Sequence, residues 1–223
     1  MAKHIDFIID CETLGHLPDG ILIDFAVVTF ENDPANPPKF DELVRNGLKV
    51  KFDIRSQIGV RHKDASVVKW WTEQSDEAKI NLKPSVDDLS LKEGYEKIMA
   101  FLASQGVKQG SSIGWCRGQS FDFSLFVTMI RNVMNSRETF EHEPCRFWNQ
   151  RDIRTAVESY LGVRYMCECP LPMGALDGFI AHDSIHDCAK DVLMLIYAQR
   201  YSYGLDDVPS EDDADPRSLK KKR

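Results

Sequence analysis

The sequence has no hydrophobic run that approaches the roughly 20 residues needed to cross a bilayer. It also has no amino-terminal stretch that combines a basic start, an apolar run and a small-residue cleavage site. Both absences argue against a membrane-spanning or secreted protein. We therefore expect a soluble, cytoplasmic protein that does not bind membranes.

Paired cysteine motifs and an excess of positive charge are also missing. The six cysteines lack the C-x-x-C spacing of a zinc site, and the C-x-C at Cys167 and Cys169 has no second pair, so reduced structural thiols are expected. The 28 Lys and Arg against 35 Asp and Glu give a net charge of -7. This balance argues against broad, charge-driven binding of nucleic acid, but it allows a local nucleic-acid site neutralised by metal ions.

The 223 residues, 43% of them hydrophobic and without an internal repeat, are sufficient for one domain with its own core. Apolar or alternating segments predict three antiparallel strands first, then two more, within the ranges 4–15, 20–30, 47–52, 111–116 and 145–148. Helical spacing and caps predict helices at 64–82, from 90 to Gly106, after Asp122, at 152–161 and at 184–201. The order predicts an α/β fold, with a mixed five-stranded sheet flanked by helices, over 1–204. An acidic and then basic tail, 205–223, is expected to be flexible.

The first candidate site is the pair Asp10 and Glu12 at the end of the apolar stretch HIDFIIDCETLG. Residues i and i+2 of a strand point to the same face, so the two carboxylates would lie side by side and repel each other. Mg²⁺ or Mn²⁺, which take oxygen ligands, would turn this repulsion into coordination. The alternative is a solvated turn in which Glu12 or Thr13 acts as a cap.

Two further acidic positions follow. Asp122 comes after the strand SSIGWC, at the start of an amphipathic helix, where it is either a site residue or an N-cap. The segment AHDSIHDCAKD contains His-x4-Asp twice, as His182 with Asp187 and as His186 with Asp191. The second pair would lie inside a helix about 140° apart, facing different ways, which favours His182 as a general base and Asp187 as a ligand. A His182 and His186 zinc pair lacks the Glu of H-E-x-x-H.

The order Asp10-x-Glu12-Thr13, Ser120-Phe121-Asp122 and His182-x4-Asp187 resembles the three exonuclease motifs of the DnaQ-like superfamily, in its histidine-containing branch. The resemblance covers residues 4 to about 200 and implies a ribonuclease H-like fold and a two-metal 3'-5' exonuclease. It implies two Mg²⁺ or Mn²⁺ ions held by Asp10, Glu12, Asp122 and Asp187, with His182 as general base. One departure is that many members carry an Asn shortly before the second-motif Asp, where this chain has RGQS at 117–120.

The resemblance also implies a nucleic-acid partner with a single-stranded 3' end, DNA first and RNA as the alternative, and release of nucleoside 5'-monophosphates. Backbone at Thr13 and Leu14 would meet the terminal ribose, with Leu14 separating the last bases. Base stacking is expected from Phe123 and Trp148, and contacts to the nucleic-acid backbone are expected from Arg151 and Arg154. The alternative is that the two aromatic residues pack in the core and the two arginines lie on a solvated face.

The tryptophans at 70 and 71 are expected in the core rather than on a base. No motif in the sequence identifies a protein partner, so protein partners are left open. Two rival functions are a single-metal or metal-independent phosphoesterase with a histidine nucleophile, and a non-catalytic nucleic-acid-binding module. The second rival expects a broken acidic set, whereas here the set is intact.

Overall fold

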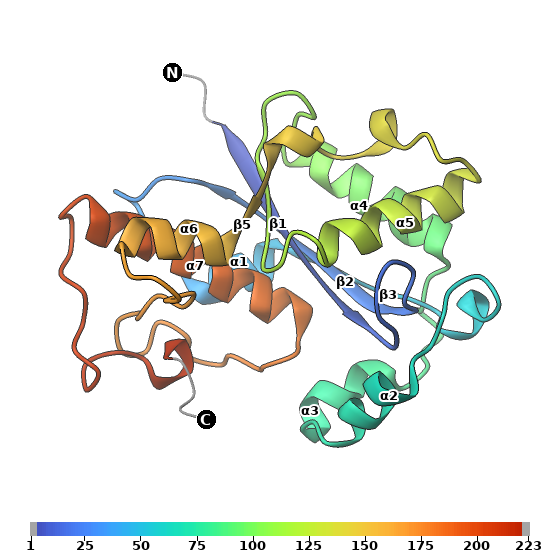
Figure 1. Ribbon diagram of the computed structural model, residues 1–223, viewed down its shortest axis with the longest axis horizontal. Coiled ribbons are helices and arrows are strands. Elements are labelled where there is room, and N and C mark those ends of the chain that lie inside the picture. The colour runs from blue at the N-terminus through green and yellow to red at the C-terminus, as the bar shows by residue number, and fades with distance from the viewer. Residues whose placement is uncertain (1–3, 220–223) are drawn as a thin grey trace.

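A computed structural model describes residues 4–219 as an α/β domain built on one mixed sheet (Figure 1). The strands lie in the order β3-β2-β1-β4-β5. The antiparallel pairs are β1 with β2 and β2 with β3, whereas β4 runs parallel to β1 and β5 parallel to β4. The predicted five-stranded sheet with three antiparallel strands first is confirmed. The strand bounds are β1 (Ile5–Thr13), β2 (Leu22–Glu31), β3 (Leu48–Lys51), β4 (Gly114–Cys116) and β5 (Gln150–Asp152).

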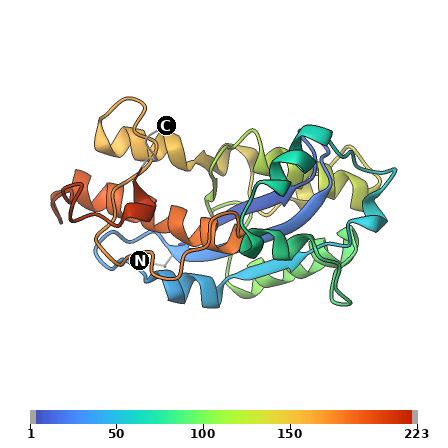
Figure 2. The same cartoon turned by 90° about the horizontal axis from the view of Figure 1, so that it is seen from below.

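Helices cover both faces of the sheet, and two more lie at one end of it (Figures 1 and 2). One face carries α1 (Phe40–Asn46), α6 (Ile153–Leu161) and α7 (Ser184–Ser202). The other carries α4 (Leu91–Ser104) and α5 (Asp122–Met134). The end helices are α2 (Ala65–Thr72) and α3 (Asp76–Lys79). Short 3-10 turns occupy 55–57, 80–82, 140–142, 147–149 and 216–218. None of the helices within 4–219 is long and apolar enough to span a membrane.

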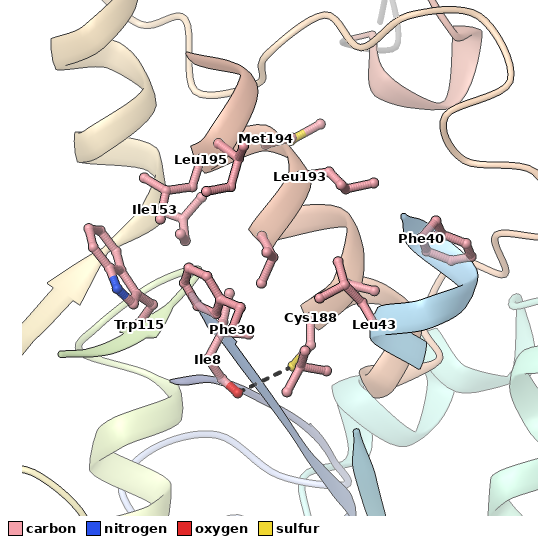
Figure 3. Packing of buried hydrophobic residues seen from close by; sticks show 14 of the residues in the cluster. Ile8, Phe30, Phe40, Leu43, Trp115, Ile153, Cys188, Leu193, Met194 and Leu195 are labelled. Atoms are coloured by element: carbon pink, nitrogen blue, oxygen red, sulfur yellow. Dashed lines mark hydrogen bonds between the residues drawn. The ribbon is translucent and has the colours of Figure 1, made fainter. Parts of the chain in front are cut away.

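Alternate residues of β1 face opposite sides of the sheet and so separate the two main cores. Ile8 packs with residues of α1, α6 and α7, whereas Phe7 and Ile9 pack with residues of α4 and α5. Figure 3 shows the first core, where side chains of the sheet and of α7 converge and the Cys188 thiol lies 3.9 Å from the Ile8 carbonyl oxygen. Further along β1, Asp10 continues the row of Ile8, so its carboxylate points toward the α7 side.

The predicted helix starts at Asp64, Ser75 and Ser90 are confirmed as N-caps. Each side chain accepts a hydrogen bond from a backbone N–H of the first turn, which would otherwise lack a partner within the helix. Ser90 and Glu93 form a reciprocal capping box. These local signals fix where the helices begin along the chain.

Two elements differ from the sequence prediction. Helix α1 lies in the connection between β2 and β3, where the sequence predicted no helix; its Phe40 and Leu43 pack into the core against α7. The fifth strand is Gln150–Asp152, not 145–148, because its polar residues pair through their backbone with β4 at the edge of the sheet. The apolar residues Phe147 and Trp148, which suggested a strand, form an exposed 3-10 turn instead.

Residues 210–219 pack onto the loop after α6, which differs from the flexible tail predicted from residue 205. Asp215 is fully buried, donates its N–H to the Leu171 carbonyl at 2.8 Å and accepts a hydrogen bond from Leu176 N at 3.0 Å. Leu171 N in turn donates to the Ser218 hydroxyl at 2.9 Å. Acidic composition suggested a solvated segment, but a satisfied buried carboxylate anchors it. The predicted basic end, 220–223, lies outside the described residues.

Candidate active site

The carboxyl end of β1 places two acidic side chains on the α7 side of the sheet. Asp10 pairs with Ala26 and Glu12 with Asp24 across the antiparallel ladder, and a register shift follows Glu12. Strand alternation therefore gives Asp10 and Glu12 a common face, as the sequence predicted. Both groups lie in the same cavity of about 720 Å³, here called the carboxylate cavity.

Asp122 reaches the same cavity from the first residue of α5. Its Oδ1 accepts hydrogen bonds from the backbone N–H of Cys11 at 3.3 Å and from the Cys11 thiol at 3.4 Å. The N-cap of α5 is Phe121, which makes no capping side-chain bond, so the N-cap alternative for Asp122 is wrong. The side chain turns toward β1 because the carboxyl ends of the parallel strands β1 and β4 meet at this edge.

His182 and Asp187 come from the start of α7. His182 has a φ of 62°, a conformation costly for a residue with a Cβ, and its N–H donates to Asp187 Oδ2 at 3.0 Å. Its Nδ1 lies 3.9 Å from Glu12 Oε1. One ligand atom from each of Glu12, His182 and Asp187 lies within 4.8 Å of the others. The sequence-predicted ligands and base are thus brought together from β1, α5 and α7.

The electrostatics of the carboxylate cavity favour a divalent cation. Burial, followed by the charges of neighbouring carboxylates, raises the pKa values of Asp10 and Glu12 well above their usual range. Burial also raises the pKa of Asp122 to about 7, and burial with the charge of Asp191 raises that of Asp187 to about 7. Oxygen donors that repel one another in a buried site fit a hard divalent metal ion, which would relieve the repulsion.

One lysine links the neighbourhood of the site to the loop that carries His182. Lys49 Nζ lies 2.9 Å from Asp183 Oδ1 and 3.8 Å from Asp24 Oδ2. Asp24 is fully buried, and burial raises its pKa to about 6 despite the lysine. Lys49 therefore offsets part of the negative charge beside Glu12 and fixes Asp183 next to His182.

These pKa shifts predict that the metal-free protein loses stability as the pH rises. Between about pH 4 and pH 7 the folded state holds protons on Asp122 and Asp187 that the unfolded chain has released, so unfolding becomes more favourable with increasing pH. In EDTA we expect the thermal midpoint to fall by at least about 5 °C from pH 5 to pH 8. Mg²⁺ should remove most of this fall, and D122N should show a smaller one. Equal pH dependence with and without Mg²⁺ would contradict a metal site.

The second His-x4-Asp pair lies apart from this arrangement. His186 Nδ1 accepts a hydrogen bond from Ile180 N at 3.0 Å, and its ring packs against Phe40 with centroids 5.4 Å apart. Asp191 reaches the carboxylate cavity but forms a bidentate pair with Arg117, whose Nη2 lies 2.6 Å from Oδ1 and whose Nε lies 3.0 Å from Oδ2. The two residues face different ways, as the helical spacing predicted. This geometry favours His182 with Asp187.

Two further hollows adjoin the carboxylate cavity and share different lining residues with it. A cavity of about 430 Å³, here the Trp70 cavity, shares Cys11, Glu12 and Phe121 with it. A groove of about 850 Å³ along α5, here the α5 groove, shares Gly118 and Ser120. A chain-like ligand could therefore cross the carboxylates with one end in each hollow.

The family described as the 3'-5' exoribonuclease Rv2179c-like domain matches residues 5–194. This chain belongs to that family. It is 50% identical to the exodeoxyribonuclease of Enterobacteria phage T4 over 225 residues, which cover 98% of this chain and 99% of the relative. The DnaQ-like resemblance of the three motifs is thereby confirmed.

Solved structures similar to this Rv2179c-like chain are exonucleases and a nuclease, at identities that show the fold alone. Cell-death related nuclease 4 has a TM-score of 0.53 at 14% identity, over 91% of this chain and 65% of its own. An E. coli ExoI–ssDNA complex has a TM-score of 0.54 at 11% identity, over 92% of this chain and 43% of its own. A full-length 3'-exonuclease has a TM-score of 0.53 at 11% identity, over 99% of this chain and 92% of its own. The chain thus spans less than two thirds of the first two.

Three of the predicted substrate residues of this family member are buried. Thr13, Leu14 and Phe123 are 6%, 8% and 3% exposed. Leu14 packs in a small core with Trp71, so its side chain does not lie where it could separate bases. Thr13 lines the Trp70 cavity, and its carbonyl accepts the Trp71 indole N–H at 2.8 Å. Phe123 belongs to the apolar face of α5 and leaves no free ring face for a base. In contrast, Trp148, Arg151 and Arg154 are exposed.

Trp70 is the residue that sequence reasoning misplaced. It is 39% exposed, lines the Trp70 cavity and meets His182 edge to face, with ring centroids 4.8 Å apart. Figure 2 shows α2 lying beside the start of α7, which brings the two rings together. Only Trp71 is in the core. Adjacent helical residues point about 100° apart, and in α2 this turns Trp71 into the core and leaves Trp70 at the cavity.

Proposed function

We propose that this chain is a metal-dependent 3'-5' exonuclease that releases nucleoside 5'-monophosphates from the 3' end of single-stranded DNA. The observation that carries the proposal is the convergence of His182 and four carboxylates in one cavity; Asp122 is buried, and Asp10, Glu12 and Asp187 are partly buried. The 50% identical exodeoxyribonuclease of phage T4 supports DNA as the substrate. The two hollows beside the cavity suit a strand whose 3' end is cut at the carboxylates.

Asp10, Glu12, Asp122 and Asp187 would hold two Mg²⁺ or Mn²⁺ ions. Such ions supply an activated water and stabilise charge on the leaving oxygen during phosphodiester hydrolysis. His182 stands at the rim beside Glu12 with its side chain 42% exposed, so its imidazole can accept the proton of the attacking water and pass it to solvent. Its backbone bond to Asp187 fixes the base relative to the ligand set.

The Trp70 cavity is proposed to take the 3'-terminal nucleoside. Its volume of about 430 Å³ lies in the range of small-ligand sites, and aromatic rings of Trp70 and Phe121 line it. Trp70 would stack on the terminal base, which replaces the role first expected of Leu14. On the other side of the carboxylates, Arg154 and Lys190 line the cavity and would contact phosphate oxygens.

RNA is the second candidate substrate, because the matching family is described as exoribonuclease-like. A single-metal or metal-independent phosphoesterase is less favoured, because four of the site's groups are carboxylates that need compensation. A non-catalytic binding module would not need the full acidic set.

The relationship to a phage protein supports action in the cytoplasm of a host cell.

Digestion of 5'-labelled oligonucleotides tests the proposal. We expect a single-stranded DNA to shorten stepwise from its 3' end with Mg²⁺ or Mn²⁺, to release 5'-monophosphates, and to stay intact in EDTA. Matched double-stranded DNA and both forms of RNA measure the preference. Activity that persists in EDTA, or release of the 5'-terminal nucleotide first, would contradict the two-metal 3'-5' mechanism.

A further inference from the structure

We propose that the α5 groove, with the exposed rings of Phe147 and Trp148 at its border, binds the single strand upstream of the scissile bond. This inference rests on the proposed function and extends it from the terminal nucleotide to the polynucleotide. The groove meets the carboxylate cavity at Gly118 and Ser120, whereas the Trp70 cavity meets it at Cys11, Glu12 and Phe121. A strand with its 3' end beside Trp70 would therefore leave the carboxylates into this groove.

One face of α5 forms the wall of the groove. Phe123, Val127 and Arg131 recur every four residues, and Ser124 and Thr128 form a second row with the same spacing, which places all five on one side of the helix. At 1.5 Å per residue, the step from Phe123 to Arg131 covers about 12 Å. That length corresponds to between three and four nucleotides at about 3.4 Å per stacked nucleotide.

The rings at the border of the groove are exposed although they cluster. Phe147 and Trp148 are 60% and 56% exposed, with ring centroids 4.9 Å apart, and Phe147 itself lines the groove. Phe140 supports both from behind, and the Arg146 guanidinium lies 4.2 Å above its ring. Exposed aromatic clusters are unusual on a surface that meets only water. Free ring faces of this kind stack on unpaired bases of any sequence.

Three arginines lie along or beside the groove against two acidic lining residues, Glu143 and Asp152, which gives it a small positive balance despite the net charge of -7. Arg131 lines it, Arg151 is held beside Trp148 by a 2.7 Å bond to the Trp148 carbonyl, and the Arg154 guanidinium lies over Gly118. The acidic lining residues have partners. Asp152 caps α6 and accepts the Gly118 N–H at 2.8 Å, and Glu143 accepts the Thr139 hydroxyl at 2.8 Å.

Kinetics with short and long substrates test this inference. For a dinucleotide and a ten-nucleotide single-stranded DNA, the wild type should show a much higher kcat/KM on the longer strand. In the double variant F147A/W148A, we expect the ratio of the two kcat/KM values to fall about 20-fold, since stacking contributes ~1–3 kcal/mol per base. W148F in an otherwise native chain should keep most of the ratio. A ratio that is unchanged in the double variant would overturn the inference.

Two further measurements guard against misfolding and against failure of the proposed function. Y203A removes a ring that is 57% exposed and lies outside the groove, and it should leave the ratio unchanged. R131Q should reduce the salt dependence of oligonucleotide binding by about one unit of slope; an unaltered slope would argue against a phosphate contact there. Wild-type protein that cuts neither substrate would refute the proposed function, whereas equal kcat/KM on both would refute the groove alone.

Discussion

Substitution of Asp10 by Asn is expected to lower kcat for 3'-end hydrolysis on the order of 10³-fold while it stabilises the metal-free protein. Asp10 is partly buried and lines the same cavity as the other three ligands. Desolvation, followed by the charges of Asp122, Asp187 and Glu12, raises its pKa well above the usual range. An amide keeps the shape of the side chain and removes one of the mutually repelling charges. Activity and stability should therefore change in opposite directions, which a loss of folding cannot imitate.

Asp6 provides a matched control in the same strand. Its carboxylate is also buried and points to the same face as Asp10, but it accepts hydrogen bonds from Ile113 N at 3.0 Å and from the Trp115 indole at 3.3 Å. D6N should retain most of the kcat and should lower the thermal midpoint, because the amide disturbs satisfied buried bonds. Steady-state hydrolysis in Mg²⁺ and thermal unfolding in EDTA at pH 8 measure both effects. More than a tenth of wild-type kcat in D10N would exclude Asp10 as a ligand.

Much of the site could be predicted because its signals are local in the chain. Alternation in β1 places Asp10 and Glu12 on one face, and the helix start after Asp183 places His182 before α7 and Asp187 in its first turn. Both inferences need only the geometry of one element. The direction of Asp122 could not be obtained in this way, because its partner Cys11 lies 111 residues earlier in the chain.

The elements that were predicted incorrectly share a dependence on distant packing. α1 is only seven residues long and acquires its stability from contacts of Phe40 and Leu43 with α7. β5 has polar side chains and exists because its backbone pairs with β4. Asp215 anchors residues that composition alone describes as solvated. Trp70 lines a cavity and Leu14 lies in a core, the reverse of what the sequence predicted, because α2 packs over the end of β1.

Substitution of His182 by Ala is expected to reduce kcat on the order of 10³-fold, within the usual range for the loss of a general base. KM should change less, since the carboxylates and both hollows remain. The reason is positional: the imidazole Nδ1 lies 3.9 Å from Glu12 Oε1, and the backbone N–H of His182 donates to Asp187 and so fixes the residue that carries the ring. A variant that keeps kcat within tenfold of wild type would remove His182 from the mechanism.

His186 is the natural control because the same helix offers it in the same sequence pattern. Its ring fills space against Phe40 and accepts the Ile180 N–H, so H186A should lower the thermal midpoint and spare most of the kcat. The opposite result would require Asp191 to serve as the ligand of a working pair. Asp191 would then have to give up its bidentate contacts with Arg117, a guanidinium that also donates to the Cys167 carbonyl at 3.1 Å. Because breaking a buried ion pair leaves an uncompensated charge, the structure favours the His182 pair on energetic as well as geometric grounds.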